Sequence, residues 1–594
     1  MMKANSILNL NNQKLKGLQM SSGLRRVFYS SFIFCFFAAF SPVAFTQDNK
    51  ENLKETVEKT AETVKTEAEK AAEAAKPEEK EKTILSIVNG VINKALFFDV
   101  AGGKIQVDNV DKDGKPVDPA QPKKKVKLPF MVVFLAVGSI FFTIIYRFIN
   151  FRMLKHSFDV VRGKYDNPDD KGEISHFKAL TSALSATVGL GNIAGVAIAI
   201  QGGGPGAVFW MMLISLFGMC AKFNSATLAQ YFRKENSDGS ISGGPMYYLE
   251  LGFKEKGKVW GSIGICLAIM YAVFLMGGAI GGGNMFQGNQ AQAAVGLSLK
   301  NLGVSADFIN SDTFKYVFGF LMAGAAAAVI LGGIKRIGNA TSKIVPIMCG
   351  VYILASTYII LANISELGNS ISLIFTEAFS AKAAFGGFLG VMITGVLRAA
   401  FSNEAGLGSA SIAHAAAKTD EPVREGIVAM MGPIIDTVIV CFMTAMVVII
   451  TGKWSAKIDS TGEALEPGAI MTMDAFGSTL SWFPYILTIC ILLFAFSTMI
   501  SWCYYGERGW IYLADKFTNN NGIKSVIVFR IVFIIFIVIG VVSNVADVVD
   551  FSNYMILSMA FPNILGSLFL TGFVWKKAKD YMDRYKAGKF KTYK

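Results

Sequence analysis

Two short glycine-rich strings, far apart in the sequence, share the pattern Gly-Leu-Gly followed by a small polar residue. The first lies within Thr187–Gly195 and the second within Glu404–Ala410, and each interrupts a long apolar segment. A helix broken in hydrocarbon has amides and carbonyls that need other partners. Helix N-termini favour a carboxylate, and free carbonyls favour a small hard cation. The matched strings therefore indicate a binding site, although glycines that merely allow close helix packing are the alternative.

The elements that must position these strings are membrane-spanning helices. Of the 594 residues, 52% are hydrophobic and only 17% are charged, against about a quarter charged in soluble chains. A span needs roughly 20 apolar residues. We predict eleven spans in an all-α membrane protein: 129–148, 179–201, 205–231, 259–281, 315–334, 342–363, 385–415, 425–452, 482–504, 523–542 and 552–575.

Lys and Arg are distributed unequally between the two sides of these spans. The connections on one side, together with the tail, carry 30 of them, and those on the other side carry 5. Because positive residues stay in the cytoplasm, the basic tail at 577–594 is predicted to be cytoplasmic and residue 128 extracytoplasmic. The net charge of +13 is then largely topological, and nucleic acid is not an expected partner.

Eleven spans divide into one plus five plus five. Each Gly-Leu-Gly string lies in the first span of a group of five, and the two spans run in opposite directions. Glycine-interrupted segments at matching places in inverted halves are typical of secondary transporters. We predict a transporter domain at 129–576 with inverted repeats at about 179–363 and 385–575.

The N-terminal extension divides into three parts. Residues 1–47 have the layout of a signal peptide or a retained N-terminal anchor. Residues 48–82 contain 19 charged residues and predict an extracytoplasmic helix or a disordered arm. Residues 83–128 predict an amphipathic helix at Ile84–Phe98 lying on the membrane, followed by a loop.

Motifs for enzymatic or ATP-driven chemistry are not found. The sequence has no G-x-x-x-x-G-K-[ST], HExxH or GxSxG string and no CxxC. Its three histidines, His156, His176 and His414, have no metal-ligand spacing and suggest no proton relay; His414 is expected to be structural. We expect neither an enzyme nor an organic cofactor.

Several strings occur in an order that resembles one family, the alanine or glycine:cation symporters, also called sodium:alanine symporters. They are Gly172–Ser175, Thr187–Gly195, Gly243–Tyr248, Gly283–Gln287, Phe401–Ser409 and Ile412–Ala415. The resemblance covers roughly residues 130 to 575. The chain departs from the family at Lys222-Phe223-Asn224-Ser225, where the family tends to have Lys-Phe-Ala-Glu, and in its long N-terminal extension.

The resemblance implies the leucine-transporter fold and sodium-coupled import of alanine, glycine or a similar small neutral amino acid. The signal layout and the distribution of Lys and Arg indicate a bacterial inner membrane. Sodium is the expected coupling ion. The expected partners are the amino acid and the lipid bilayer. Two alternatives remain: a proton-coupled amino-acid transporter, and a transporter-like sensor or receptor in which residues 48–82 act as an external arm.

A zwitterion needs donors for its carboxylate, acceptors for its ammonium group and a bounded space for its side chain. Amides at the first string and an adjacent Asn can supply donors and acceptors, and an aromatic residue can limit substrate size. The candidate substrate-binding residues are Gly189, Gly191, Asn192, Gln287, Thr394, Phe401 and Ser402.

Sodium prefers oxygen ligands, and charged groups inside spans are functional candidates. By analogy with the leucine-transporter fold, the candidate sodium ligands are Ser185, Val188, Ser497 and Thr498. The two hydroxyls can instead bond back to their own helix. Arg398, Glu404 and Asp436 are candidates for a gate or an ion pair, with Arg398–Glu404 as one possible pair and a cation or a nearby Arg as the partner of Asp436. Arg530 is expected to snorkel or pair.

Overall fold

The computed structural model describes residues 84–102, 104, 106–107, 124–125, 127–236, 239–330, 333–380, 387–455, 468–518 and 522–593. The chain divides into two compact units, Met1–Val88 and Asn89–Lys594. Both the predicted signal or anchor at 1–47 and the predicted charged arm at 48–82 lie outside the described residues. The second unit contains the functional elements and is described below.

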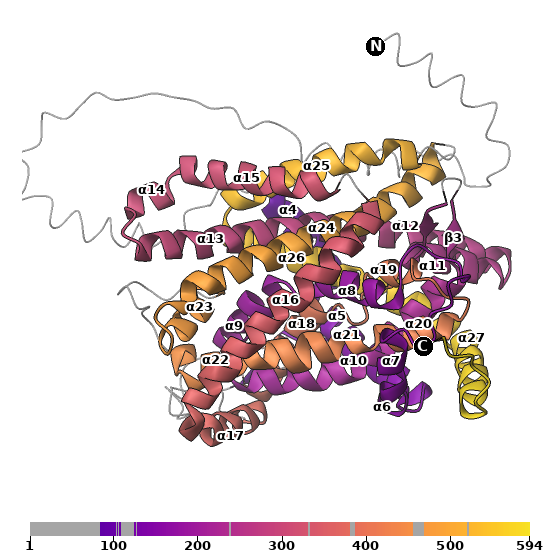
Figure 1. The fold of residues 1–594 in the computed structure, drawn as a ribbon, viewed down its shortest axis with the longest axis horizontal. Helices are drawn as coiled ribbons and strands as arrows, with labels where there is room; N and C mark the ends of the chain where they lie inside the picture. Colours follow the sequence, from indigo (N-terminus) through magenta and orange to yellow (C-terminus); the bar gives the residue numbers. More distant parts are fainter. Residues whose placement is uncertain are drawn as a thin grey trace, which may run out of the picture. The chain divides into compact units, whose positions relative to one another are not determined.

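Two short segments precede the apolar helices. Helix α4 covers Ile84–Leu96, and strands β1 (Gln106–Val107) and β2 (Lys124–Lys125) form an antiparallel pair with Gln106 opposite Lys125. A second pair, β3 (Lys234–Glu235) and β4 (Ile241–Ser242), follows the third predicted span. The rest of the described chain is almost entirely helical (Figure 1).

Nine helical segments of the described chain are long and apolar enough to cross a membrane. They are His176–Gly203, Gly206–Tyr231, Lys258–Asn301, Asp312–Ile330, Ile334–Ala362, Pro422–Ile450, Phe483–Phe517, Gly522–Val542 and Val545–Lys586. Two further apolar helices are shorter, α5 (Phe130–Ile145) and α18 (Gly387–Asn403). Every predicted span overlaps one of these segments.

Four of the nine long segments consist of several elements with a change of geometry between them. The composite segments contain α8 (His176–Thr187), α9 (Leu190–Gly203), α12 (Lys258–Ile280), the π-helix η1 (Gly281–Met285), α13 (Phe286–Asn301), α20 (Pro422–Ala429), α21 (Met431–Pro433), the π-helix η3 (Ile434–Cys441), α22 (Phe442–Ile450), α26 (Val545–Ser558) and α27 (Ala560–Lys586). The simple ones are α10 (Gly206–Tyr231), α15 (Asp312–Ile330), α16 (Gly333–Ala362), α24 (Phe483–Phe517) and α25 (Gly522–Val542). Shorter connecting helices include α6 (Ile149–Arg152), α7 (Leu154–Val161), α11 (Pro245–Lys254), α14 (Ala306–Asn310), α17 (Leu367–Ala378), α19 (Ser411–Ala415) and α23 (Ala469–Gly477).

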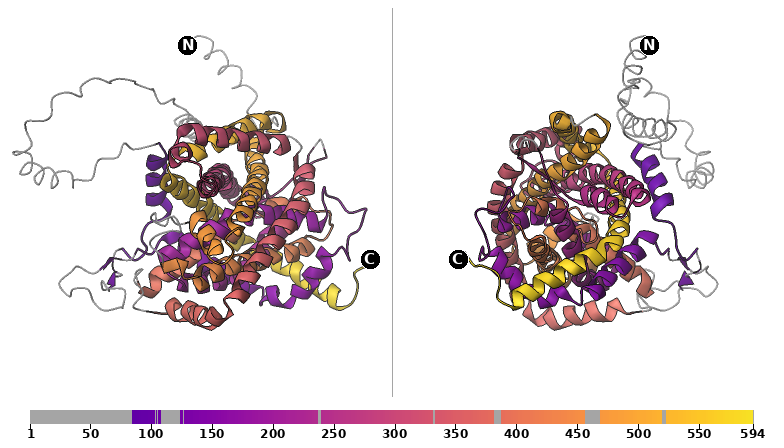
Figure 2. Two further views of the ribbon diagram at one scale, coloured as in Figure 1. Left: turned by 60° about the vertical axis from the view of Figure 1, so that its left-hand side comes forward. Right: turned by 90° about the vertical axis from the view of Figure 1, so that its right-hand side faces the viewer.

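The broken segment α8–α9 forms the interior of the second unit. Nearly all of its residues are buried, and it is contacted by α16, α18, α23 and α24. Helix α10 packs against α5, α18 and α20, while α24 packs against α12 and α25. Figures 1 and 2 show α15 and α25 side by side along one edge of this unit, with α27 running along its outside.

Small residues allow the close approach of these helices. A methyl group built on Gly283 of η1 would overlap the Trp502 side chain of α24, and one on Gly540 of α25 would overlap Met285. In lipid, such contacts take the place of a hydrophobic drive between helices. Two aromatic hydroxyls add buried polar links: Tyr146 donates to Asn224 Oδ1 at 2.5 Å, and the Tyr352 and Thr444 hydroxyls lie 2.6 Å apart.

Candidate functional site

The first break lies between α8 and α9, at Val188 and Gly189. The Gly189 amide donates to Asn192 Oδ1 at 2.9 Å, and the Leu190 amide donates to Gln287 Oε1 at 3.2 Å. Side chains therefore satisfy the amides freed at the start of α9. Gln287 Nε2 in turn donates to the Gly282 carbonyl at 2.9 Å.

Gln287 lies beyond the predicted end of the fourth span at residue 281. The helix instead continues through the π-helix η1 into α13, and Gln287 is 3% exposed. The π-turn keeps the chain helical across three consecutive glycines and directs the amide at the break.

Asn192 connects the first break to the π-helix η3. Its Nδ2 donates to Asp436 Oδ1 at 2.7 Å and to the Asp436 carbonyl at 3.1 Å, and its own carbonyl accepts from Thr444 Oγ1 at 2.8 Å. The other carboxylate oxygen of Asp436 accepts from Ser402 Oγ and Thr437 Oγ1, each at 2.8 Å. Asp436 is thus a fully buried carboxylate with three neutral side-chain donors. Among the described residues no Arg bonds to it, contrary to one expectation, and the cation with which it interacts electrostatically is Lys222.

The second break begins where α18 ends at Asn403. Glu404 has the left-handed φ of 56°, and Gly406 and Gly408 follow at +84° and +83°. Asn403 Oδ1 caps the turn by accepting from the Ala405 amide at 2.9 Å, and its Nδ2 donates to Thr437 Oγ1 at 3.0 Å. A non-glycine residue in this region is unusual and marks a constrained turn.

Phe401 and Ser402 are carried to the first break by α18. A methyl group on Gly191 would lie 3.5 Å from the Phe401 ring, and that ring meets Phe286 edge-on with centroids 5.4 Å apart. Six predicted substrate residues therefore gather around the breaks: Gly189, Gly191, Asn192, Gln287, Phe401 and Ser402. Thr394 does not join them, because it bonds to the Gly390 carbonyl and lies beside Gly203, at the opposite end of α9.

Three of the four predicted sodium ligands link α8 to α24 by two reciprocal bonds. Ser185 Oγ donates to the Ser497 carbonyl at 2.7 Å, and Thr498 Oγ1 donates to the Ser185 carbonyl at 3.0 Å. Ser497 Oγ bonds back to its own helix at Phe494. Val188 lies at the break beside Gly189, where a methyl group would overlap Thr498 Oγ1. Hydroxyl and carbonyl oxygens thus surround the end of α8, as a hard cation requires.

The remaining charged candidates do not form the predicted pair. Glu404 accepts from Ser409 Oγ and shares a small cavity of about 10 Å³ with Lys222 and Ser225. Arg398 instead has an electrostatic interaction with Asp550 of α26, and its buried Nη1 has no hydrogen-bond partner in the described part of the chain. The Arg398–Glu404 pairing is therefore absent. Arg530 pairs with Glu507 at 2.6 Å.

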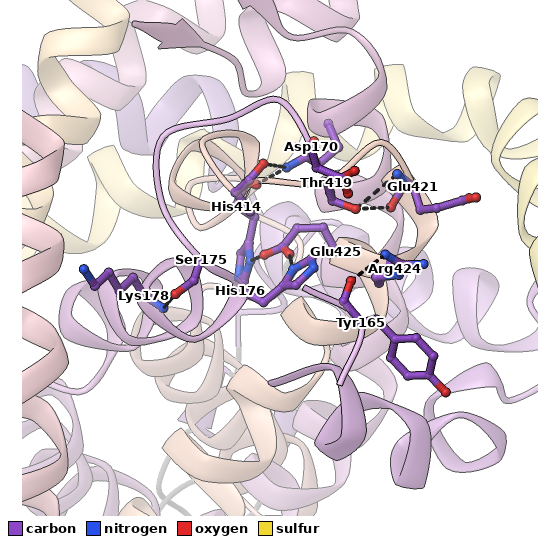
Figure 3. A network of polar contacts seen from close by, with 12 residues as sticks. Tyr165, Asp170, Ser175, His176, Lys178, His414, Thr419, Glu421, Arg424 and Glu425 are labelled. Carbon is purple, nitrogen blue, oxygen red and sulfur yellow. Dashed lines mark hydrogen bonds and ion pairs between the residues drawn. The ribbon is translucent and has the colours of Figure 1, made fainter. Parts of the chain in front are cut away.

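One cluster was missed by the sequence reasoning. His176, the first residue of α8, and His414 of α19 both direct Nδ1 at the carboxylate of Glu425 in α20 (Figure 3). The three positions span 249 residues, and no local spacing reveals them. The sequence predicts only a structural role for His414. The structure adds a direct contact between its Nδ1 and the Glu425 carboxylate.

The geometry defines a class: a helical, multi-pass membrane protein in which buried polar groups gather at two broken helices. A model of the sodium:alanine symporter family matches residues 120–594. The chain belongs to that family and is an amino-acid:cation symporter by this membership.

Curated relatives agree with this class. The sodium/alanine symporter AgcS of Methanococcus maripaludis is 39% identical over 456 residues, covering 76% of this chain and 94% of its own length. A Bacillus subtilis protein named "Probable sodium/glutamine symporter GlnT" is 33% identical, covering 77% and 89%. A crystal structure of MhsT in complex with L-phenylalanine covers 69% of this chain and 99% of MhsT, at 14% identity and a TM-score of 0.45.

Proposed function

We propose that the protein is a sodium-coupled symporter that imports small neutral amino acids, alanine and glycine foremost, by alternating access. The observation that carries the proposal is the joining of both broken helices by one buried network, Asn192–Asp436–Ser402. A ligand that replaces any of these hydrogen bonds would alter the contact between the two broken helices, and would therefore act on both repeats.

The substrate would bind where this network meets the N-terminus of α9. Its carboxylate would accept hydrogen bonds from the Gly189 and Leu190 amides, which now donate to side-chain oxygens. Its ammonium group would donate to Asp436 or to a freed carbonyl. Phe401 and Phe286 limit the side chain, since their rings already contact each other next to Gly191. A methyl group or a hydrogen fits this limit better than a carboxamide arm.

Sodium would bind at the end of α8, between Ser185 and Val188 on one side and Ser497 and Thr498 on the other. The oxygens of these residues now satisfy one another across α8 and α24. An ion inserted there replaces two hydrogen bonds with several ion–oxygen contacts, and so couples the first repeat to the second. The sodium gradient then drives import as the broken helices move against their neighbours.

The proposal includes the topology predicted above: eleven crossings, a repeat of 1 + 5 + 5 in inverted orientation, and a cytoplasmic C-terminus. Its test is uptake of radiolabelled L-alanine into proteoliposomes, with an inward sodium gradient or with choline in place of sodium at fixed pH. Glycine and glutamine are run in parallel. Sodium-dependent accumulation of alanine and glycine above glutamine is expected. Equal uptake in choline would exclude sodium coupling, and glutamine preference would exclude the substrate class.

A further inference from the structure

Two of the chain's three histidines meet at one buried carboxylate. His414 Nδ1 lies 2.5 Å from Glu425 Oε1, and His176 Nδ1 contacts Glu425 Oε2. The His176 and His414 side chains are 1% exposed and Glu425 is not exposed at all. An ionised carboxylate only accepts, so both Nδ1 atoms carry hydrogen and the two Nε2 atoms remain for a further proton.

Charge counting shows why this cluster would take up a proton. With two neutral imidazoles the cluster has a net charge of −1, which the nearby Arg233 offsets only from outside the cluster, and a buried charge is expensive. One proton on either Nε2 makes it neutral, and a second makes it positive. His176 Nε2 is buried and has no partner among the described residues, so it is free to gain the proton. Imidazole is the side chain that does this near neutral pH.

The neighbouring charged groups bond to other partners. Arg233, which lies between α10 and β3, donates to the carbonyls of Ala415, Ala417, Lys171 and Thr419. Arg424, which precedes Glu425 in the chain, donates to the Tyr165 carbonyl. Other charged or titratable groups on the packed elements are Lys222 and Glu404, which share a cavity with His414, Asp170 and Asp420 near Arg233, His156 bonded to Tyr581, Asp159 paired with Lys164, Glu421 paired with Arg584, Glu173 accepting from the Ile241 amide, Lys178 donating to Asn339, and, on α24, Glu507 paired with Arg530 and Arg508 donating to Ser242. Arg233 is the positive charge that opposes protonation of the cluster.

The cluster lies where the two broken segments are already attached to each other. The Glu173 amide donates to the Ala416 carbonyl at 2.8 Å, and the Lys418 amide donates to the Ile174 carbonyl at 2.7 Å. Figure 3 shows His176 entering from the start of α8 and His414 from the end of the second break, with Glu425 between them. Any state in which these ends separate must give up the cluster.

We propose that His176, Glu425 and His414 form a proton-binding site, and that the bound proton favours the closed junction between the start of α8 and the end of the second break. The reaction is addition of one solvent proton to an imidazole Nε2, with no other bond formed or broken. The effect on transport rests on the proposed function. Because a proton that binds better to the closed junction stabilises it by mass action, acidification on the side of this junction holds it closed and slows uptake.

The binding step is tested by NMR of the full chain labelled with ¹³C and ¹⁵N at histidine, in detergent micelles. Three sets of imidazole signals are expected, one set per histidine. His156 is the internal control, since burial and then the charge of Arg424 lower its pKa to about 4. The His176 and His414 signals should together report uptake of one proton at a higher pH than the His156 signal titrates, and Glu425→Gln should move that uptake to lower pH. No uptake above the His156 titration, or equal uptake in Glu425→Gln, would overturn the proposal.

The transport consequence is tested by sodium-driven alanine uptake at several internal pH values. Uptake by the native protein should fall severalfold on internal acidification, and Glu425→Gln should flatten this dependence while His156→Gln keeps it. A full pH response in Glu425→Gln would overturn the effect on the junction. Should Glu425→Gln fail to fold, His414→Gln keeps the His176–Glu425 pair and should show titration of one ring. Absence of any sodium-driven uptake would contradict the proposed function and leave the NMR test in force.

Discussion

At the scale of single residues, Asn192 has the most connections in the candidate site. It bonds to the Gly189 amide, to Asp436 and to Thr444. Asn192→Ala would remove one of the three side-chain donors to a buried carboxylate, a loss of about 2–4 kcal/mol. We expect alanine uptake to fall at least about tenfold, since 1.4 kcal/mol corresponds to that factor. The measurement is sodium-driven uptake at matched protein levels.

Asn363→Ala is the matched control for this change. Asn363 is also an amide with two hydrogen bonds, to Ile359 and Thr479, but it lies away from both breaks. It should retain uptake near the native level. Equal losses in Asn192→Ala and Asn363→Ala would mean that the site of Asn192 has no special role.

Thr498 allows a sharper test of the sodium site. Thr498→Ala removes a hydroxyl that meets the Ser185 carbonyl at the end of α8. If this oxygen is a ligand, the sodium concentration for half-maximal uptake should rise severalfold, with a smaller change in the maximal rate. Thr488→Ala is the control on the same helix, where the hydroxyl bonds to Ser298 and Pro484. A shift in sodium dependence that is as large in Thr488→Ala would contradict the assignment.

At the scale of elements, the break between α8 and α9 depends on a glycine. A methyl group on Gly189 would overlap Thr498 Oγ1 and lie 3.3 Å from Gln287 Oε1. Gly189→Ala should therefore push α8 away from α24, abolish sodium-dependent uptake and lower the melting temperature. Gly195→Ala, in the same segment, has its nearest atom at 4.0 Å and should keep uptake, with helix propensity gaining up to about 1 kcal/mol. Similar behaviour of the two variants in uptake and thermal unfolding would refute this account.

The sequence predicted the helical elements better than the contacts between them. Apolar length located the helical segments, and the glycine pattern located both breaks, because both signals are local. The continuation of α12 through η1 into α13 was hidden, since three glycines and a polar run look like the end of a helix. Likewise the Asn192–Asp436 contact joins positions 244 residues apart, and no local period encodes it. Phe401 and Thr394 looked equivalent on α18, but only Phe401 faces the break.

One departure from the family acquires a physical explanation at this scale. Ser225 stands where the family tends to have a Glu, and it lines the cavity of about 10 Å³ beside Lys222, close to the size of a single water molecule. Glu404, at the second break, lines the same cavity. The carboxylate beside Lys222 is therefore supplied by the second break and not by α10. We expect Ser225→Glu to crowd two carboxylates around one Lys and to lower stability and uptake, as thermal unfolding and transport assays would show. Full activity of Ser225→Glu would argue that the cavity is merely vacant space.

At the scale of the whole second unit, connections with the same predicted sidedness contact each other. The tail meets the connection 147–178, where the Tyr593 amide donates to the Lys164 carbonyl at 2.9 Å and Tyr581 bonds to His156. Connections of the other set also meet, since Asn289 donates to the Ser543 carbonyl at 3.3 Å. Charge counting and folding thus divide the connections into the same two groups. Which of the two groups faces the cytoplasm is then predicted only from the excess of Lys and Arg on one side.

That direction leads to the last prediction. In a chain with its seven cysteines replaced by alanine, Lys591→Cys in the exposed tail and Asn310→Cys in the exposed helix α14 provide one probe for each group. In intact cells, a membrane-impermeant maleimide should label Asn310→Cys and should reach Lys591→Cys only after permeabilisation, because Lys and Arg are retained inside. The reverse pattern would invert the topology. It would also place the His176–Glu425–His414 junction on the outer side, where external rather than internal acidification would slow uptake.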